Sequence, residues 1–262
     1  MDINLRGIID LEKKWSQAQP FSHVVIDNFL PQDIAEKVAE EFPDANSDFW
    51  YEYANPLEIK KACSDWNKFP PSIYQVFNAL VSDKVEHALS ILTKKKVVAD
   101  CGLHGGGLHC HKAGGKLNTH LDYSLHPKLN LQRKVNIIIY VSKDWNPAWD
   151  GALGFWDNDD SDGLDKPGNL IQKVDCVFNR AVIFDTTQKS WHGLPDPVLC
   201  PDNISRNSLA TYYLCEPPTD VDIRGKALYA PAENQKGDEK ITELIAKRAS
   251  LTDFSQVYKV KD

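Results

Sequence analysis

A closely spaced histidine and aspartate, together with a distant second histidine, are the residues of this sequence best suited to chemistry. His120 and Asp122 lie two positions apart, so on a β-strand both side chains project from the same face. His192, much further along the chain, adds a second imidazole. Two histidines and one carboxylate form a facial triad that leaves part of a metal's coordination sphere open, as in non-haem Fe(II) sites. The alternative interpretation is a solvated strand pair and an unrelated buried imidazole.

Short strands separated by turn residues surround this candidate site. The run from 133 to 141 alternates two largely apolar faces, so we expect a central strand that is covered on both sides. Further strands are expected at residues 21–30, 97–101, 150–156, 174–178, 180–185, 190–193 and 206–215. Many short strands with Gly, Pro and Asp between them are typical of a sandwich or barrel.

Helical patterns flank these strands. Four helices are predicted, a peripheral one within residues 1–20 and others over residues 31–41, 70–92 and 234–249. The aromatic stretch 44–69 shows no clear periodicity, and we interpret it as cover for the core rather than as a flap facing substrate. We therefore predict a mainly β fold with flanking helices (α+β) in a single domain. Its parts are a helical N-terminal support (1–95), a β core (96–216) and a C-terminal extension with a helix (217–262).

The composition argues against several classes of protein. With a net charge of −7 and a pI near 5.6, the chain is a poor general binder of nucleic acid or of anionic membrane surfaces, because both repel an acidic surface. No basic segment leads into an apolar run at the start, and no apolar run is long enough to span a bilayer. The six cysteines are scattered without a C-x-x-C pair, which indicates reduced thiols. We accordingly expect a cytoplasmic protein.

Several motifs in the second half of the chain resemble, in order, those of the 2-oxoglutarate/Fe(II) dioxygenases, and most closely the prolyl 4-hydroxylase type. They are Gly106–Pro127, Arg133–Trp145, Asp150–Leu153, Asn179–Phe184, Trp191–Gly193 and Ser205–Leu209. The similarity extends from roughly residue 97 to 215 and is weaker over 21–43. The resemblance implies a double-stranded β-helix, or jelly-roll, core. It also implies hydroxylation of an unactivated C–H bond with 2-oxoglutarate and O₂, with release of succinate and CO₂, and the possible involvement of ascorbate.

Carried over residue by residue, the resemblance implies that His120, Asp122 and His192 bind Fe(II). It implies that Arg206 holds the distal carboxylate of 2-oxoglutarate and that Tyr140 donates a hydrogen bond to the same group. The physical need is clear, because a dianionic cosubstrate in a dry barrel requires a fixed cation, and a guanidinium pairs with a carboxylate bidentately. The alternatives are a surface ion pair for the arginine and a core aromatic with a bonded hydroxyl for the tyrosine.

Three further residues, His111, Asn136 and Ser208, are candidates for the cosubstrate pocket. Many family members have a tyrosine where His111 stands, so this histidine either donates to 2-oxoglutarate or belongs to the core. Asn136 either contacts the cosubstrate or satisfies a neighbouring polar group. Another departure is Asp150-Gly151, where the family usually shows two glycines; we expect Gly151 alone to supply the turn.

The substrate is the least determined part of this interpretation. Five residues beside the metal motifs are candidates to line the mouth, although each could equally be a packing residue: Tyr123, His126, Arg133, Trp156 and Trp191. The resemblance favours a peptidyl proline, with a free amino acid or another small molecule as the alternative. A metal-binding jelly roll without turnover also stays open. A halogenase is disfavoured because such enzymes lack the carboxylate that Asp122 supplies. The sequence leaves the oligomeric state open.

Overall fold

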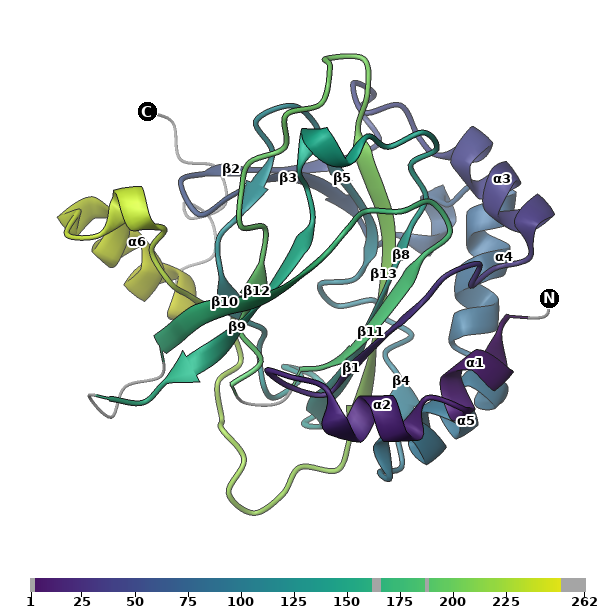
Figure 1. The fold of residues 1–262 in the computed structure, drawn as a ribbon, viewed down its shortest axis with the longest axis horizontal. Coiled ribbons are helices and arrows are strands. Elements are labelled where there is room, and N and C mark those ends of the chain that lie inside the picture. Colours follow the sequence, from purple (N-terminus) through teal and green to yellow (C-terminus); the bar gives the residue numbers. More distant parts are fainter. Residues whose placement is uncertain (1–2, 162–165, 187–188, 251–262) are drawn as a thin grey trace.

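Two antiparallel β-sheets face each other in this protein, and helices cover the outer face of the larger one (Figure 1). The structure is a computed structural model that describes residues 3–161, 166–186 and 189–250. The arrangement of two facing sheets with helices on one side confirms the predicted jelly roll with helical flanks.

Within the described residues, the larger sheet contains nine strands. Seven lie in the order β1 (His23–Ile26), β11 (Ala181–Asp185), β8 (Gln132–Tyr140), β13 (Arg206–Cys215), β5 (Gly107–His111), β3 (Glu58–Cys63) and β2 (Tyr51–Asn55). Two short strands join them, β4 (Val98–Ala99) on β13 and β6 (Lys116–Leu117) on β3. The smaller sheet has the order β10 (Lys166–Val174), β9 (Leu153–Asp159), β12 (His192–Gly193), β7 (His120–Leu121) and β14 (Leu228–Tyr229).

Strand β8 lies in the middle of the larger sheet and is buried on both faces, as its sequence predicts. Val135, Ile137 and Ile139 belong to the core shared with the helices. Asn136 and Ile138 alternate with them and face the smaller sheet, where they line a cavity. One strand therefore provides both the helix-packing surface and a wall of the candidate site.

The helices before the β core pack on the outer face of the larger sheet, on the right of Figure 1. They are α1 (Leu5–Ile9), α2 (Glu12–Gln17), α3 (Gln32–Glu41), α4 (Pro71–Leu80) and α5 (Asp83–Thr93). The single long helix predicted over 70–92 is wrong, because the chain forms α4 and α5 instead. Ser82 between them adopts an extended conformation, and its hydroxyl donates to the carbonyl of Ala79 at 2.6 Å. Such local serine hydrogen bonds compete with helix continuation.

The aromatic stretch 44–69 is more regular than predicted. It forms the β2–β3 hairpin, which extends the larger sheet through pairing of β3 with β5, followed by a short 3-10 helix, η1 (Trp66–Lys68). Trp50 packs in the core with Phe42, as the interpretation of a cover requires. Tyr53, however, lines the cavity between the sheets. The hairpin is thus both cover and cavity wall.

The C-terminal segment completes the smaller sheet and adds a helix beside it. β14 pairs with β7, so that Tyr229 lies directly opposite His120. Two 3-10 helices, η2 (Pro147–Trp149) and η3 (Glu233–Gln235), lie in loops, and η3 leads to α6 (Glu239–Ala249). Asp238 caps α6 by accepting from the backbone amides of Lys240 and Ile241. In the part of the chain that the structure describes, no helix is both long and apolar enough to cross a bilayer.

Candidate functional site

The two histidines and the aspartate singled out from the sequence meet at the centre of the smaller sheet. His120 on β7 pairs directly with His192 on β12, and Asp122 follows β7 immediately. All three residues are buried, and one ligand atom from each lies within 4.8 Å of the others. Neighbouring strands thus bring together residues that are far apart in sequence, in an arrangement that could hold a metal ion.

Both imidazoles are oriented with the same nitrogen toward the aspartate. Nδ1 of His120 lies 2.9 Å from the carbonyl of Asn118, and Nδ1 of His192 lies 2.8 Å from that of Ser190. A carbonyl oxygen only accepts, so each Nδ1 carries the hydrogen and each Nε2 keeps its lone pair. The Nε2 atoms lie 3.7 Å and 3.6 Å from the Asp122 carboxylate oxygens. Two lone pairs and a carboxylate therefore converge on one point.

The carboxylate of Asp122 is itself fixed by Arg133. Nη1 of Arg133 lies 2.9 Å from Oδ1 of Asp122, and both side chains are buried. The guanidinium is stacked between the rings of Tyr123 and Tyr212, at 3.5 Å and 3.4 Å from their centroids. Its Nη2 donates to the carbonyl of His104 at 2.9 Å. Asp122 is thus held in one orientation, with its Oδ2 left to a further partner.

The protonation states of the three residues suit metal binding. Burial, helped by the charge of His192, lowers the pKa of His120 to about 3. Burial likewise lowers the pKa of His192. Burial raises the pKa of the Asp122 carboxyl, but Arg133 and the two imidazoles outweigh it and bring this pKa down to about 2. At neutral pH the site therefore presents neutral imidazoles and an ionised carboxylate.

Arg206 lies on β13 at the inner end of the same cavity. It is 3% exposed, and its Nε donates to the carbonyl of Gly151 at 2.6 Å. A guanidinium held through Nε keeps its two terminal nitrogens for a bidentate pair with a carboxylate. Its central carbon lies 4.8 Å from the centroid of the Tyr140 ring. Burial raises the pKa of Tyr140 to about 12, although the charge of Arg206 acts in the opposite direction. The phenol therefore keeps its proton and can donate.

Gly151 is required by this close approach. Its φ is +77°, and a Cβ at this position would meet Cδ of Arg206 at 2.9 Å. The preceding Asp150 also has a positive φ of 56°, with ψ −143°. This conformation is one that glycine adopts freely and other residues only under strain. The turn thus contains two consecutive residues at positive φ, Asp150 and Gly151.

Several buried polar atoms in and beside this cavity have no hydrogen-bond partner among the described residues. They are both ring nitrogens of His111, the hydroxyl of Tyr140, Oδ1 of Asn136 and Oδ2 of Asp122. Because buried polar groups are nearly always bonded, such a concentration indicates a site built for a polar occupant. A metal ion beside Oδ2 and a keto acid between Arg206 and the imidazoles would satisfy these atoms, so the residues present fit both groups.

A cavity of about 390 Å³ connects the metal-site residues with Arg206. His111, Asn136 and Ser208 line it, together with Arg206, in agreement with the positions expected for them. Tyr140 is not a lining residue, but its ring contacts the guanidinium of Arg206, which is one. A larger hollow of about 990 Å³ lies elsewhere, between β10 and η3, and none of the three metal-site residues borders it.

Of the five candidate substrate residues, the structure places two in the cavity wall, Tyr123 and Arg133. The other three do not border it, which differs from the expected position at the mouth. His126 is buried beside Asp100, with Nε2 3.7 Å from the carboxylate. Trp191 is fully buried and donates to Asn158, whereas Trp156 borders the larger hollow. Strand alternation explains the positions of Trp191 and Trp156, because they adjoin His192 and Phe155 along the chain and point to the opposite face.

The C-terminal segment supplies cavity residues that the sequence gave no reason to select. The ring of Tyr229 stacks on His120, with centroids 5.2 Å apart. Nη2 of Arg248, from α6, lies 2.5 Å from Oε1 of Glu58 and donates to the hydroxyl of Tyr229 at 3.2 Å. Lys226 also lines the cavity. No local motif marks these residues, because their position depends on the pairing of β14 with β7.

Solved structures of prolyl hydroxylases share this fold. A Pseudomonas putida prolyl-4-hydroxylase superposes with a TM-score of 0.55 at 16% identity, covering 82% of this chain and 100% of that one. A Trichoplax adhaerens prolyl hydroxylase, in complex with a hypoxia inducible factor peptide fragment, gives 0.54 at 16%, covering 80% and 92%. A Phytophthora capsici prolyl 4-hydroxylase gives 0.53 at 17%, covering 95% and 77%. At such identities the likeness establishes the fold.

Sequence comparison addresses the family directly. No curated protein sequence matches the chain significantly. Residues 106–214 match the family model described as the 2OG-Fe(II) oxygenase superfamily. That region runs from β5 to β13 and contains the metal-site residues, Arg206 and the strands that position them. Over this region, which is less than half of the chain, the protein is similar to the 2OG-Fe(II) oxygenase superfamily.

Proposed function

We propose that this protein is a 2-oxoglutarate- and O₂-dependent Fe(II) hydroxylase that acts on an unactivated C–H bond. The observation that carries the proposal is the convergence of His120, Asp122 and His192, by their metal-ligating atoms, in a cavity that ends at the buried Arg206. A site with three protein ligands and open positions is suited to a metal that also binds a cosubstrate, rather than to structural zinc, which is enclosed by four protein ligands.

The three metal-site residues would hold Fe(II) on one face. The bound iron supplies the activation of O₂ and the oxidation of the substrate carbon, coupled to decarboxylation of 2-oxoglutarate. The protein contributes ligands of fixed protonation, because the carbonyls of Asn118 and Ser190 hold each Nδ1–H and Arg133 holds the carboxylate. Fixed ligands favour one geometry for the open positions.

Arg206 would bind the distal carboxylate of 2-oxoglutarate, with Tyr140 donating a second hydrogen bond. Burial of both residues strengthens the pairing, since few water molecules compete for the guanidinium. His111 and Asn136, whose polar atoms lack partners, are placed to contact the same molecule. Ser208 lies across from Tyr140 on the neighbouring strand and completes this wall.

The most favoured substrate is a peptidyl proline, giving the 4-hydroxylated residue, succinate and CO₂. Support comes from the order of motifs in the sequence and from the fold shared with prolyl hydroxylases. A free amino acid or another small molecule is the alternative. Ascorbate as a reductant of the iron and a cytoplasmic location remain proposals that accompany this assignment.

The deciding experiment is a mass-spectrometric screen of proline-containing peptides and small metabolites, with Fe(II), 2-oxoglutarate and O₂. We expect a substrate that gains one oxygen in step with the formation of succinate. Oxygen gain on a small metabolite alone would assign the alternative substrate class. No succinate with any substrate, despite bound metal and cosubstrate, would identify a non-catalytic metal-binding module and overturn the proposal.

A further inference from the structure

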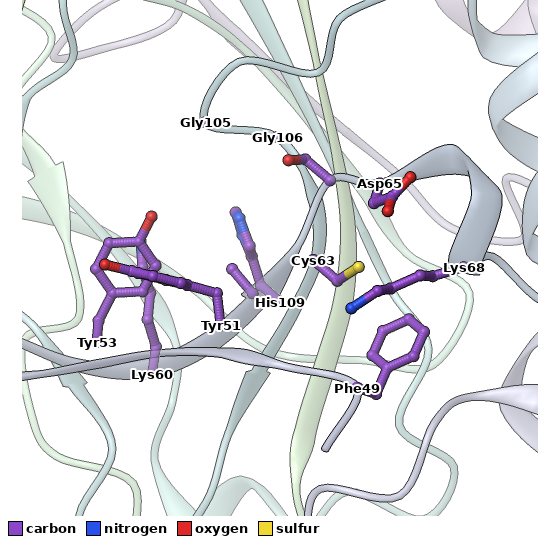
Figure 2. Close-up of a pocket in the computed structure, with 12 residues that line it drawn as sticks. Phe49, Tyr51, Tyr53, Lys60, Cys63, Asp65, Lys68, Gly105, Gly106 and His109 are labelled. Atoms are coloured by element: carbon purple, nitrogen blue, oxygen red, sulfur yellow. The ribbon is translucent and has the colours of Figure 1, made fainter. Parts of the chain in front are cut away.

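A second cavity of about 340 Å³ adjoins the one that contains the metal-site residues (Figure 2). It lies between the β2–β3 hairpin and the loop at Gly105 and Gly106. The two cavities share five lining residues: Tyr53, Lys60, Ser64, Gly105 and His109. We call the second cavity the hairpin groove. Because the two cavities share these residues, a substrate whose reactive carbon lies at the metal site can extend into the hairpin groove.

The walls of the two cavities are positively charged, in contrast to the whole chain. The chain has 30 basic and 37 acidic residues. The walls carry six basic residues: Lys60, Lys68, Arg133, Arg206, Lys226 and Arg248. They carry three acidic ones: Glu58, Asp65 and Asp122. The walls therefore carry more basic than acidic residues.

The acidic residues of the walls are already engaged. Glu58 is shared by Arg248, at 2.5 Å, and by Lys60, at 3.3 Å. Asp65 accepts from the backbone amide and the side chain of Asn67, at 3.0 Å and 3.1 Å, and so caps η1. The ion pair of Asp122 with Arg133 was described above. Glu58 is therefore shared between two basic side chains and does not serve Lys60 alone.

Lys68 is the second basic residue of the hairpin groove. It is exposed, and within the part of the chain that the structure describes it has no ion-pair partner. Figure 2 shows its side chain extending towards Cys63 and Phe49, while the carboxylate of Asp65 lies apart from its amino group. The rings of Phe49, Tyr51 and Tyr53 provide apolar surface beside the two lysines. The groove thus combines a cationic and an aromatic lining.

We propose that the hairpin groove binds an acidic segment of a peptide substrate, with a carboxylate side chain close in sequence to the hydroxylated residue placed between Lys60 and Lys68. The inference rests on the proposed function, since it assigns the part of the substrate that flanks the reactive carbon. A cavity with one sign of charge concentrates ligands of the opposite sign, and an elongated path suits an extended chain better than a compact metabolite.

The test uses two fluorescein-labelled peptides of equal length with one central proline, flanked by glutamate in one and by glutamine in the other. Binding to the full chain is measured by fluorescence anisotropy without oxygen, with Fe(II) and 2-oxoglutarate present. We expect the glutamate peptide to bind about three- to tenfold more tightly at low salt, because exposed ion pairs contribute modestly and are screened. The preference should shrink as salt is added.

Charge reversal at Lys68 gives the matched comparison. Lys68→Glu should abolish the preference for the glutamate peptide, whereas Lys84→Glu, the same change on exposed α5 away from both cavities, should retain it. Equal binding of both peptides, absence of binding by either, or an unchanged preference in Lys68→Glu would each overturn the assignment.

Equilibrium dialysis of Fe(II) and 2-oxoglutarate with the same preparations separates this inference from the proposed function. Failure to bind either cofactor would contradict the proposed function, even if an acidic peptide bound through Lys68. Normal cofactor binding together with indifferent peptide binding would overturn the groove assignment alone.

Discussion

The two imidazoles of the metal site are oriented by the same local contact. In each case Nδ1 bonds to the backbone carbonyl two residues earlier, Asn118 for His120 and Ser190 for His192. The tautomer is therefore set within each segment, whereas the third ligand depends on a distant residue. Asp122 relies on Arg133, and Arg133 in turn on the rings of Tyr123 and Tyr212. At the level of single residues, the site combines local orientation with long-range support.

Removal of one imidazole should abolish the metal site. In His192→Ala we expect Fe(II)-dependent turnover to fall by at least about a hundredfold, because even loss of a residue that supports a ligand costs ten- to a hundredfold. Equilibrium dialysis of Fe(II) and succinate formation are the measurements. His87→Ala, on the exposed face of α5, is the control and should bind Fe(II) normally. Retained turnover in His192→Ala would contradict the ligand assignment.

Shortening the cation at the inner end of the cavity should weaken the cosubstrate specifically. Arg206→Lys loses the bidentate geometry, and a charged hydrogen bond contributes roughly 1.5–3 kcal/mol, so we expect KM for 2-oxoglutarate to rise about ten- to a hundredfold. Arg180→Lys is the control, because Arg180 pairs with Asp27 outside the cavity. Unchanged KM in Arg206→Lys would place the keto acid elsewhere.

The strained turn at Asp150 should be relieved by glycine. With φ 56° and ψ −143°, Asp150 occupies a region in which a Cβ is unfavourable. Asp150→Gly should therefore raise the free energy of unfolding by about 1 kcal/mol, after the larger unfolded-state entropy of glycine is subtracted. Chemical denaturation measures this change. Asp150→Ala keeps the Cβ and should bring no gain; equal stabilisation by both substitutions would refute the strain argument.

Among the elements, the C-terminal segment has the least obvious role in sequence and a direct role in the structure. β14 pairs with β7, and α6 carries Arg248 to Glu58 on β3. Glu58 and Arg248, which are far apart in sequence, thus meet at one wall of the cavity. The β2–β3 hairpin forms the neighbouring wall and places Tyr53 and Lys60 there. Both elements therefore contribute to the cavity lining.

The ion pair between α6 and β3 should be important for stability. Both side chains are buried, so Arg248→Ala removes the closest cation from the Glu58 carboxylate and should lower the free energy of unfolding by about 3 kcal/mol. Adding Glu58→Gln removes the buried charge and should restore part of that loss. Denaturant unfolding of both single variants and the double variant measures the coupling. Strictly additive losses would mean that the pair contributes nothing.

Considered as a whole, the molecule places helices on one side of the larger sheet and its polar cavity on the other. The interior between the sheets holds several imidazoles that burial keeps neutral. The pKa of His120 is lowered to about 3, and that of His111 is lowered well below its usual value, in both cases mainly by burial. In the unfolded chain these groups take up a proton near their ordinary pKa of about 6.5.

The metal-free protein should therefore lose stability on mild acidification. Below pH about 6.5 the unfolded state binds more protons than the folded state, so the free energy of unfolding falls by up to about 1.4 kcal/mol per pH unit for each such histidine. The loss continues until the pH approaches the folded pKa, about 3 for His120. Denaturant unfolding between pH 7.5 and 5 measures the slope. His111→Leu should flatten the slope by roughly one proton; an identical slope would show that His111 does not contribute.

Much of the fold could be predicted because its signals are local. The alternation in β8 indicated a central strand, and Asn136 lies on the cavity face that this alternation implies. The break between α4 and α5 was missed, since the apolar spacing continues across Ser82 and only a single hydroxyl bond marks the interruption. The β2–β3 hairpin was missed because its aromatic residues lie both at the exposed edge of the sheet and in the cavity wall, which leaves no clear alternation of apolar and polar residues.

By itself, the sequence determined which residues are chemically capable and on which strand faces they lie, because strand periodicity and motif order are properties of neighbouring residues. The tertiary structure alone decided that Arg133 holds Asp122 and that Arg248 and Tyr229 border the cavity. These relations depend on the pairing of distant strands and on burial. Neither is encoded in any local pattern, because both arise only when the two sheets close on each other.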